Sequence, residues 1–297
     1  MFSEQDIKSQ FNDETLTYLK NKHRGGGNNQ KGNTYENHFA VCRIAQCAQA
    51  VVEEGRRFLF WSQVLTFVDD LIIEHQEANL RQHYQLKSGS SQVWGSGLKS
   101  ISEDFRGQKR LNDSQQFNSE LGLVVSTEEL KKSLEEGIPV DIQPFSQVIW
   151  FHYDSSLSKV IDKEPVLRQG LEYLCAVKPT KDKIETVAAS LLGAWASIDT
   201  SSGVTVDEIL DMVRKQSPTF IRLLGPEPEI DPDVKEILDS IPLFRYQLSK
   251  GFFHWEFGEG LEEGILMYSC DRPEFRYFQN RVKERRPTSF DELQNLL

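Results

Sequence analysis

The residues best suited to chemistry lie in the stretch 67–89, FVDDLIIEHQEANLRQHYQLKSG. Asp69 and Asp70 open one apolar run, and Gln85 stands two residues before Lys87 in the next. Carboxylate and amide oxygens are ligands that suit Mg²⁺, and a lysine ammonium stabilises negative charge that develops at phosphorus. These residue types together predict metal-assisted hydrolysis of a phosphodiester.

Two short strands joined by a polar turn are expected to position these side chains. Because side chains alternate across a strand, Gln85 and Lys87 share one face of the second strand. Asp70 shares a face of the first strand with Glu74, which lies farther along it, whereas Asp69 falls on the opposite face. A register shift of one residue would exchange the two aspartates, so the choice between them stays open.

A further carboxylate precedes this stretch. Glu36 lies in the first turn of a helix predicted from residue 34 onward, whose apolar residues include Phe39, Ile44 and Val51. The ordinary interpretation is an acid that favours the positive end of the helix dipole. The alternative is that Glu36 completes the ligand set of a metal.

The flanking segments predict an α/β architecture. We expect helices over residues 1–22 and 93–105, a buried strand over 121–126, a capped helix from Thr127, and a strand within 145–153. The loop 23–33, HRGGGNNQKGN, lacks the spacing of a phosphate-binding loop and is typical of a flexible linker. A strand–strand–helix–strand order predicts a mixed sheet flanked by helices.

Three segments, 32–36 (GNTYE), 68–70 (VDD) and 84–88 (YQLKS), resemble the PD-(D/E)XK nuclease superfamily. Within it, they are similar to the double-strand DNA endonuclease effectors of bacterial anti-phage defence, such as CBASS-associated nucleases and nuclease subunits of Lamassu-type systems. The resemblance covers residues 25–130 and implies a restriction-endonuclease-like core.

Roles for individual residues follow from this resemblance. It implies Mg²⁺ (or Mn²⁺) held by Asp70, Gln85 and Glu36, with Asp69 able to exchange roles with Asp70, and Lys87 as the catalytic lysine. Gln85 replaces the acid that is more usual in the superfamily, although glutamine looks usual for this branch. The replacement removes one negative charge at the metal.

Charge is unevenly distributed along the chain, whose net charge is -11. Residues 1–122 carry 14 basic and 15 acidic side chains, and residues 123–297 carry 20 and 30. The first part can therefore approach a polyanion that the second would repel. Contacts with the DNA backbone are predicted for Lys31, Arg106, Lys109 and Arg110, although such residues are more often solvated surface.

The second half predicts a separate, mostly helical domain. Helices over 180–198 and 206–213, followed by a hairpin over 243–257, are in the order typical of a winged helix. We expect a nuclease domain over 1–160 and a partner-binding or oligomerisation domain over 161–297. The acidity of the second domain favours protein as its partner.

The resulting hypothesis is an Mg²⁺-dependent endodeoxyribonuclease that cuts double-stranded DNA and is held in check by partner subunits. The partner is expected to be an SMC-like or other ATPase or sensor subunit, or a further copy of the chain. Two alternatives are a non-enzymatic adaptor with a degenerate nuclease fold and an RNase toxin with the same metal chemistry.

Location and redox state are also predicted. The first residues lack the pattern of a signal peptide, and the chain lacks a long apolar run, so a cytoplasmic protein without membrane contact is expected. The four cysteines show no C-x-x-C pair and are expected to be reduced, mostly buried thiols.

Overall fold

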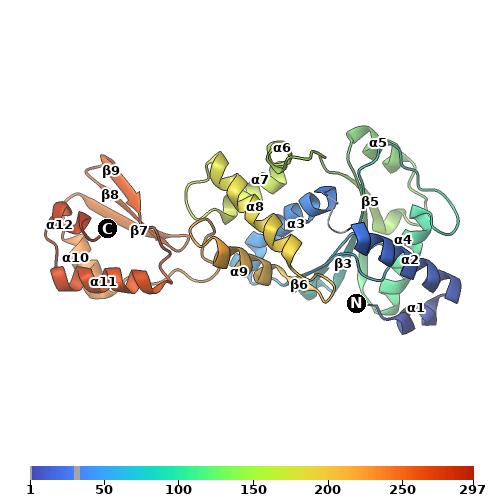
Figure 1. Ribbon diagram of the computed structural model, residues 1–297, viewed down its shortest axis with the longest axis horizontal. Coiled ribbons are helices and arrows are strands. Elements are labelled where there is room, and N and C mark those ends of the chain that lie inside the picture. The colour runs from blue at the N-terminus through green and yellow to red at the C-terminus, as the bar shows by residue number, and fades with distance from the viewer. Residues whose placement is uncertain (1, 30–33) are drawn as a thin grey trace. The chain divides into compact units, whose positions relative to one another are not determined.

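The computed structural model describes residues 2–29 and 34–297, and the chain divides into two compact units (Figure 1). The first comprises Met1–Tyr173 with Ala188–Leu210, and the second comprises Leu174–Val187 with Asp211–Leu297. The first unit therefore extends past residue 160. Helices α8 (Lys181–Ser197) and α9 (Val206–Gln216) each contribute to both units.

Six strands of the described residues form the sheet of the first unit, in the order β5-β4-β3-β2-β1-β6. Neighbours β1, β2 and β3 pair antiparallel, as do β1 and β6, whereas β3, β4 and β5 pair parallel. The predicted mixed sheet flanked by helices is confirmed. The strands are β1 (Phe58–Trp61), β2 (Leu71–His75), β3 (Leu80–Lys87), β4 (Asn118–Val125), β5 (Ser146–Trp150) and β6 (Val204–Thr205).

The strands β2 and β3 are the predicted pair, with Leu71 opposite Tyr84. A short 3-10 turn, Gln76–Ala78, and Asn79 in the left-handed conformation (φ 48°) connect them. Asp69 and Asp70 precede β2 instead of opening it. Strand β1, which was not predicted from the sequence, pairs antiparallel with β2.

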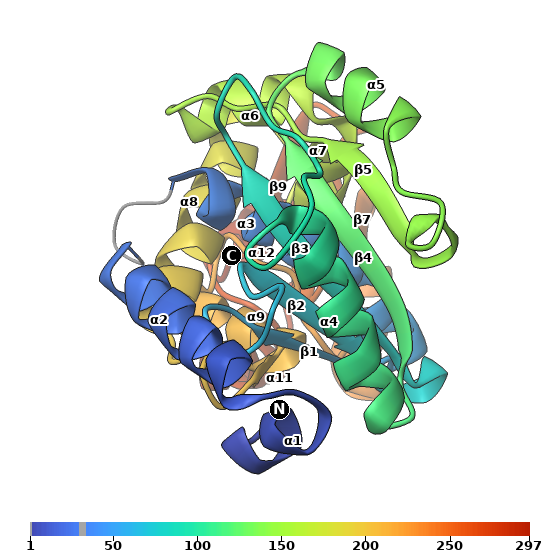
Figure 2. The same ribbon diagram turned by 90° about the vertical axis from the view of Figure 1, so that its right-hand side faces the viewer.

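Helices α3 (Thr34–Glu54) and α4 (Ile101–Ser114) cover opposite faces of the sheet (Figures 1 and 2). Phe39 of α3 meets Tyr84 edge-on, with ring centroids 5.2 Å apart. The Gln108 amide of α4 lies 3.3 Å from the ring of His83. Tyr84 and His83 are neighbours in β3 and point to opposite faces, so this central strand is covered from both sides.

The helix predicted over 93–105 begins later, at Ile101. Gly95, Gly97 and Lys99 have φ of 68°, 80° and 76°, which a helix does not admit. The Ser100 hydroxyl then accepts a hydrogen bond from the Glu103 amide and starts α4.

The single helix predicted over 1–22 is two helices, α1 (Glu4–Gln10) and α2 (Asp13–Asn29). They are separated at Asn12, whose side chain accepts a hydrogen bond from the Thr15 amide at 2.9 Å. Helix α2 continues through residues 23–29, where a loop was predicted. Extending a helix that is already packed costs less than nucleating one.

Helix α5 packs against β4 and β5, and Gly170 of α7 lies against Ala45 of α3. Helix α5 has the predicted cap, since the Thr127 hydroxyl accepts a hydrogen bond from the Leu130 amide. The remaining helical elements of the first unit are the 3-10 turn η2 (Gln143–Phe145), α5 (Glu128–Glu136), α6 (Leu157–Lys163) and α7 (Pro165–Leu174).

In the second unit the predicted hairpin is confirmed and gains a third strand. Phe253 of this sheet is fully buried in a cluster with Phe275 and Phe278. The elements are α10 (Pro232–Asp239), β7 (Phe244–Ser249), β8 (Phe252–Phe257), β9 (Glu262–Ile265), α11 (Pro273–Arg285) and α12 (Phe290–Gln294).

All four cysteines are free and buried, as predicted. Of the helices in the described ranges 2–29 and 34–297, none combines the length and apolarity needed to cross a bilayer.

Candidate active site

Asp70 lies at the junction of the two central strands. Its Oδ2 atom accepts a hydrogen bond from the Leu86 amide at 2.7 Å and another from Nε2 of Gln85. The β2–β3 register begins with Leu71 opposite Tyr84, so Asp70 and Gln85 are the next residues beyond this pair on the two chain segments. This carboxylate is therefore held in place by two donors from β3.

Glu36 approaches the same place from the first turn of α3, and Gln63 donates a hydrogen bond to its Oε2 atom at 3.1 Å. Burial, and then the charge of Asp70, raise the pKa of Glu36 to about 8, while Lys87 acts in the opposite direction. The Glu36 carboxyl thus lies within electrostatic reach of both Asp70 and Lys87. The three ionisable residues with the principal predicted roles therefore lie in one neighbourhood.

Lys87 ends β3 and lies opposite Val125 of β4. It is half-buried. Burial raises the pKa of Asp104 on α4, and the charges of Lys22 and, to a smaller extent, Lys87 oppose that rise. The Lys87 ammonium therefore lies within electrostatic reach of the Glu36 and Asp104 carboxyl groups.

Asp69 takes a different direction from Asp70. Its side chain is 3% exposed, and burial raises its pKa to about 7. The nearest cation is Nζ of Lys22 on α2, 3.6 Å from Oδ1. Of the two aspartates, Asp70 is the one fixed against Gln85, and this arrangement favours Asp70 over Asp69 as the chief metal ligand.

Lys22 and Asp104 were not predicted as site residues. Nζ of Lys22 donates to Oε1 of Gln85 at 3.1 Å, to Oδ2 of Asp104 at 3.0 Å and to the Phe67 carbonyl. Gln85 therefore presents its amide oxygen to Lys22 and its nitrogen to Asp70. To ligate a metal beside Asp70 through oxygen, as the sequence predicted, this amide has to turn over.

A buried polar network fixes the chain just before the aspartates. The side-chain oxygen of Gln108 accepts hydrogen bonds from the Thr66 hydroxyl at 2.6 Å, the Phe67 amide at 3.2 Å and the Val68 amide at 3.1 Å. Nδ1 of His83 lies 3.0 Å from the Val68 carbonyl. A carbonyl only accepts, so Nδ1 carries the proton.

The two network residues are fully buried and electrically neutral. Burial lowers the pKa of His83 to about 3, and Gln108 has no exposed surface. Gly107 allows the close approach of the Phe67 ring, because a Cβ atom there would lie 2.6 Å from it. Helix α4 thus positions the segment that leads to Asp69 and Asp70.

The predicted DNA-binding side chains of α4 already have partners within the chain. Arg106 pairs with Asp141 at 2.5 Å and with Glu103 at 2.7 Å. Lys109 pairs with Asp113, and Arg110 lies over the Phe11 ring, 5.1 Å from its centroid. The fourth predicted residue, Lys31, lies outside the described residues.

The donors at the site are hard oxygens, the type that Mg²⁺ and Mn²⁺ prefer. Within the described ranges, no cluster of three or more His, Cys, Asp and Glu side chains has the arrangement of a metal site. Glu36 and Asp70 provide two carboxylates, and Gln85 provides an amide, which such a cluster does not include. Glu36 and Asp70 are neighbouring acids, and the charge of Asp70 contributes to the raised pKa of Glu36. A divalent cation bound between them would neutralise this repulsion.

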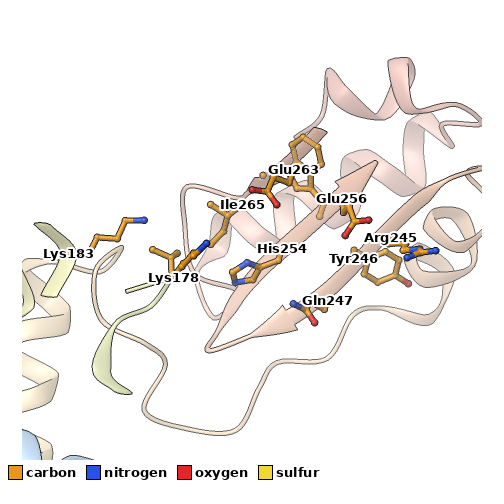
Figure 3. A pocket seen from close by; sticks show the side chains of 12 residues that line it. Lys178, Lys183, Arg245, Tyr246, Gln247, His254, Glu256, Glu263 and Ile265 are labelled. Atoms are coloured by element: carbon orange, nitrogen blue, oxygen red, sulfur yellow. The ribbon is translucent and has the colours of Figure 1, made fainter. Parts of the chain in front are cut away.

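A cleft of about 620 Å³ lies in the second unit (Figure 3). Its lining mixes basic side chains such as Lys178 and Lys183 with the acids Glu256 and Glu263. Glu36, Asp70 and Lys87 are not part of this lining. The cleft therefore does not contribute to the candidate active site.

Comparison of the chain with models of protein families, with curated proteins and with solved structures finds no match.

The pKa of Glu36 predicts pH-dependent metal binding. Its ordinary value is 4.5, and the folded value of about 8 means that the folded state holds this proton more tightly. Raising the pH from 4.5 to 8 should therefore reduce the contribution of Glu36 to the stability of the folded state. A divalent cation that displaces the Glu36 proton should bind more tightly as the pH rises over the same range. We expect Mn²⁺ affinity to rise by up to about tenfold per pH unit and to level off above pH 8.

Titration of Mn²⁺ at a series of pH values checks this expectation, with Glu36→Gln as the matched variant. Glu36→Gln should flatten the profile, apart from the smaller contribution of Asp69. An affinity that stays constant in wild type from pH 6 to pH 8 contradicts the expected displacement of the Glu36 proton.

Proposed function

We propose that the protein is a metal-dependent endonuclease that hydrolyses phosphodiester bonds of double-stranded DNA. The observation that carries the proposal is the convergence of Glu36, Asp70 and Lys87 at one end of β2 and β3. A PD-(D/E)XK core has this pattern, with an acid before a strand and a lysine two residues after a polar ligand on the next. The mixed sheet between α3 and α4 is compatible with such a core.

Each residue has a role that its surroundings support. Asp70 and Glu36 would hold Mg²⁺, with Gln85 as a third oxygen ligand after its amide turns over. The bound ion would supply positive charge at the scissile phosphate. Lys87 would stabilise the charge that develops on the non-bridging oxygens of that phosphate.

The second unit would serve regulation, through contacts with an ATPase, a sensor subunit or another copy of the chain. The second unit, residues 174–187 and 211–297, carries 15 basic and 18 acidic side chains, so it offers DNA no net positive charge. Large apolar side chains of this unit are exposed, including Leu261 at 85% and Met267 at 79%. A winged-helix-like element and an effector role in anti-phage defence belong to the same proposal.

Incubation with supercoiled plasmid and Mg²⁺, alone and with copurifying proteins, tests the proposal. We expect linear and nicked products, and chelation by EDTA should reduce the rate by at least about a hundredfold. A parallel incubation with RNA of matched length separates a deoxyribonuclease from an RNase.

Two outcomes would count against the proposed activity. The first is cleavage that EDTA leaves unaffected. The second is an intact plasmid in every mixture, together with no Mn²⁺ binding that depends on Asp70, because a non-enzymatic adaptor would give this result.

A further inference from the structure

The ammonium of Lys22 is surrounded by oxygen atoms. Nζ donates to the Phe67 carbonyl, to Oε1 of Gln85 at 3.1 Å and to Oδ2 of Asp104 at 3.0 Å. Oδ1 of Asp69 lies 3.6 Å away. These four oxygens come from α4, β3 and the segment before β2, so the fold assembles them independently of α2.

Asp69 supplies a second, independent observation. Its side chain is 3% exposed, and within the described residues its Oδ1 atom has no hydrogen-bond donor. A buried carboxylate oxygen without a donor is costly unless a cation lies close by. Oδ1 is directed toward the position that Nζ of Lys22 occupies.

The oxygens around Lys22 also form a ligand set for a divalent cation. Two carboxylates, one amide oxygen and one main-chain carbonyl are the donor types found in Ca²⁺ and Mg²⁺ sites. Tyr18 completes the surroundings, since its hydroxyl donates to Oδ1 of Asp104 at 2.9 Å. Lys22 therefore fills a position whose donor types also suit a divalent cation.

We propose that Lys22 is a resident cation that occupies a second metal position, formed by Asp69, Asp104, the Phe67 carbonyl and, in the amide orientation that the structure shows, Gln85. The inference rests on the proposed function in placing this position beside the catalytic metal held by Asp70 and Glu36. It implies that the enzyme works with one divalent ion, and that Lys22 supplies the charge that a second ion provides in two-metal sites. Lys22 is then a positioning residue, which also sets the orientation of the Gln85 amide.

Replacing Lys22 with methionine tests the proposal, because it removes the ammonium and keeps an unbranched side chain. After equilibrium dialysis against Mn²⁺, bound metal per chain should exceed the wild-type number by one. Lys22→Arg keeps the charge, and Lys20→Met removes a lysine of the same helix that pairs with Glu4, so both should match wild type. Adding Asp104→Asn to Lys22→Met should remove the additional ion.

The thermal melting temperature, measured with and without Mn²⁺, is a second readout that stays informative when Lys22→Met folds poorly. Lys22→Met should be less stable than wild type without metal and should gain more from Mn²⁺ than wild type does. A Lys22→Met chain that gains neither an additional ion nor stability from Mn²⁺ overturns the proposal. The number of Mn²⁺ ions bound by the wild-type chain tests the Asp70 site. The difference in this number between Lys22→Met and wild type tests the position at Lys22. Failure of the proposed function and failure of this inference are therefore distinguishable.

Discussion

Replacing Lys87 with alanine should lower the rate of DNA cleavage by about 10²–10³-fold, the cost of removing one group that stabilises a transition-state charge. Metal affinity should change little or rise slightly, because the substitution removes a positive charge near Glu36. The rate should be measured under single-turnover conditions with Mg²⁺, so that binding and product release do not obscure the chemical step.

Lys132 offers a matched control for this substitution. It is an exposed lysine of α5 in the same unit, and Lys132→Ala should leave the rate within about twofold of wild type. Lys87→Arg should restore only part of the rate, since a guanidinium differs from an ammonium in shape and hydration. Cleavage by Lys87→Ala at the wild-type rate would remove Lys87 from the catalytic group.

Replacing Gln108 with methionine should lower the free energy of unfolding by roughly 3–5 kcal/mol, since each buried polar group left without a partner costs about 1–3 kcal/mol. The substitution preserves the approximate shape of the side chain but removes the acceptor for the Phe67 and Val68 amides and the Thr66 hydroxyl. It should also weaken Mn²⁺ binding, because the segment that leads to Asp70 loses its anchor on α4. Urea unfolding and Mn²⁺ titration measure the two effects.

An exposed glutamine provides the control for Gln108. Gln49 of α3 makes one side-chain hydrogen bond, to Glu53 at 2.9 Å, and Gln49→Ala should change stability by less than about 0.5 kcal/mol. If Gln108→Met unfolds at the wild-type urea concentration, the buried network does not stabilise the site as inferred.

Much of the central architecture follows from local sequence patterns. The alternation in residues 67–89 was sufficient to predict the pairing of β2 with β3, and the Thr127 cap was sufficient to predict the start of α5. The orientation of the two aspartates was not predictable, because both precede β2 and strand alternation does not apply there. Tertiary contacts with Lys22 and Gln85 determine their directions.

The sequence indicates the polar residues that support the site less clearly than it indicates the strands. Asp104, Gln108 and Asn112 recur at intervals of four on the buried face of α4, beside Phe105 and Leu111. Polar residues at core positions indicate a buried network, but the predicted boundary of 93–105 excluded two of the three. Lys22 gave no signal of its own, because a lysine on an amphipathic helix is ordinarily solvated.

Asp70 and Glu36 are proposed to bind a divalent cation for phosphodiester hydrolysis. The most direct measurement is anomalous X-ray scattering from a crystal of the protein grown with Mn²⁺ at a pH above 8, where the Glu36 carboxyl is ionised. We predict a peak within about 2.0–2.6 Å of carboxylate oxygens of both Asp70 and Glu36. A crystal whose Mn²⁺ peaks all lie elsewhere, with none at these two side chains, would contradict the claim.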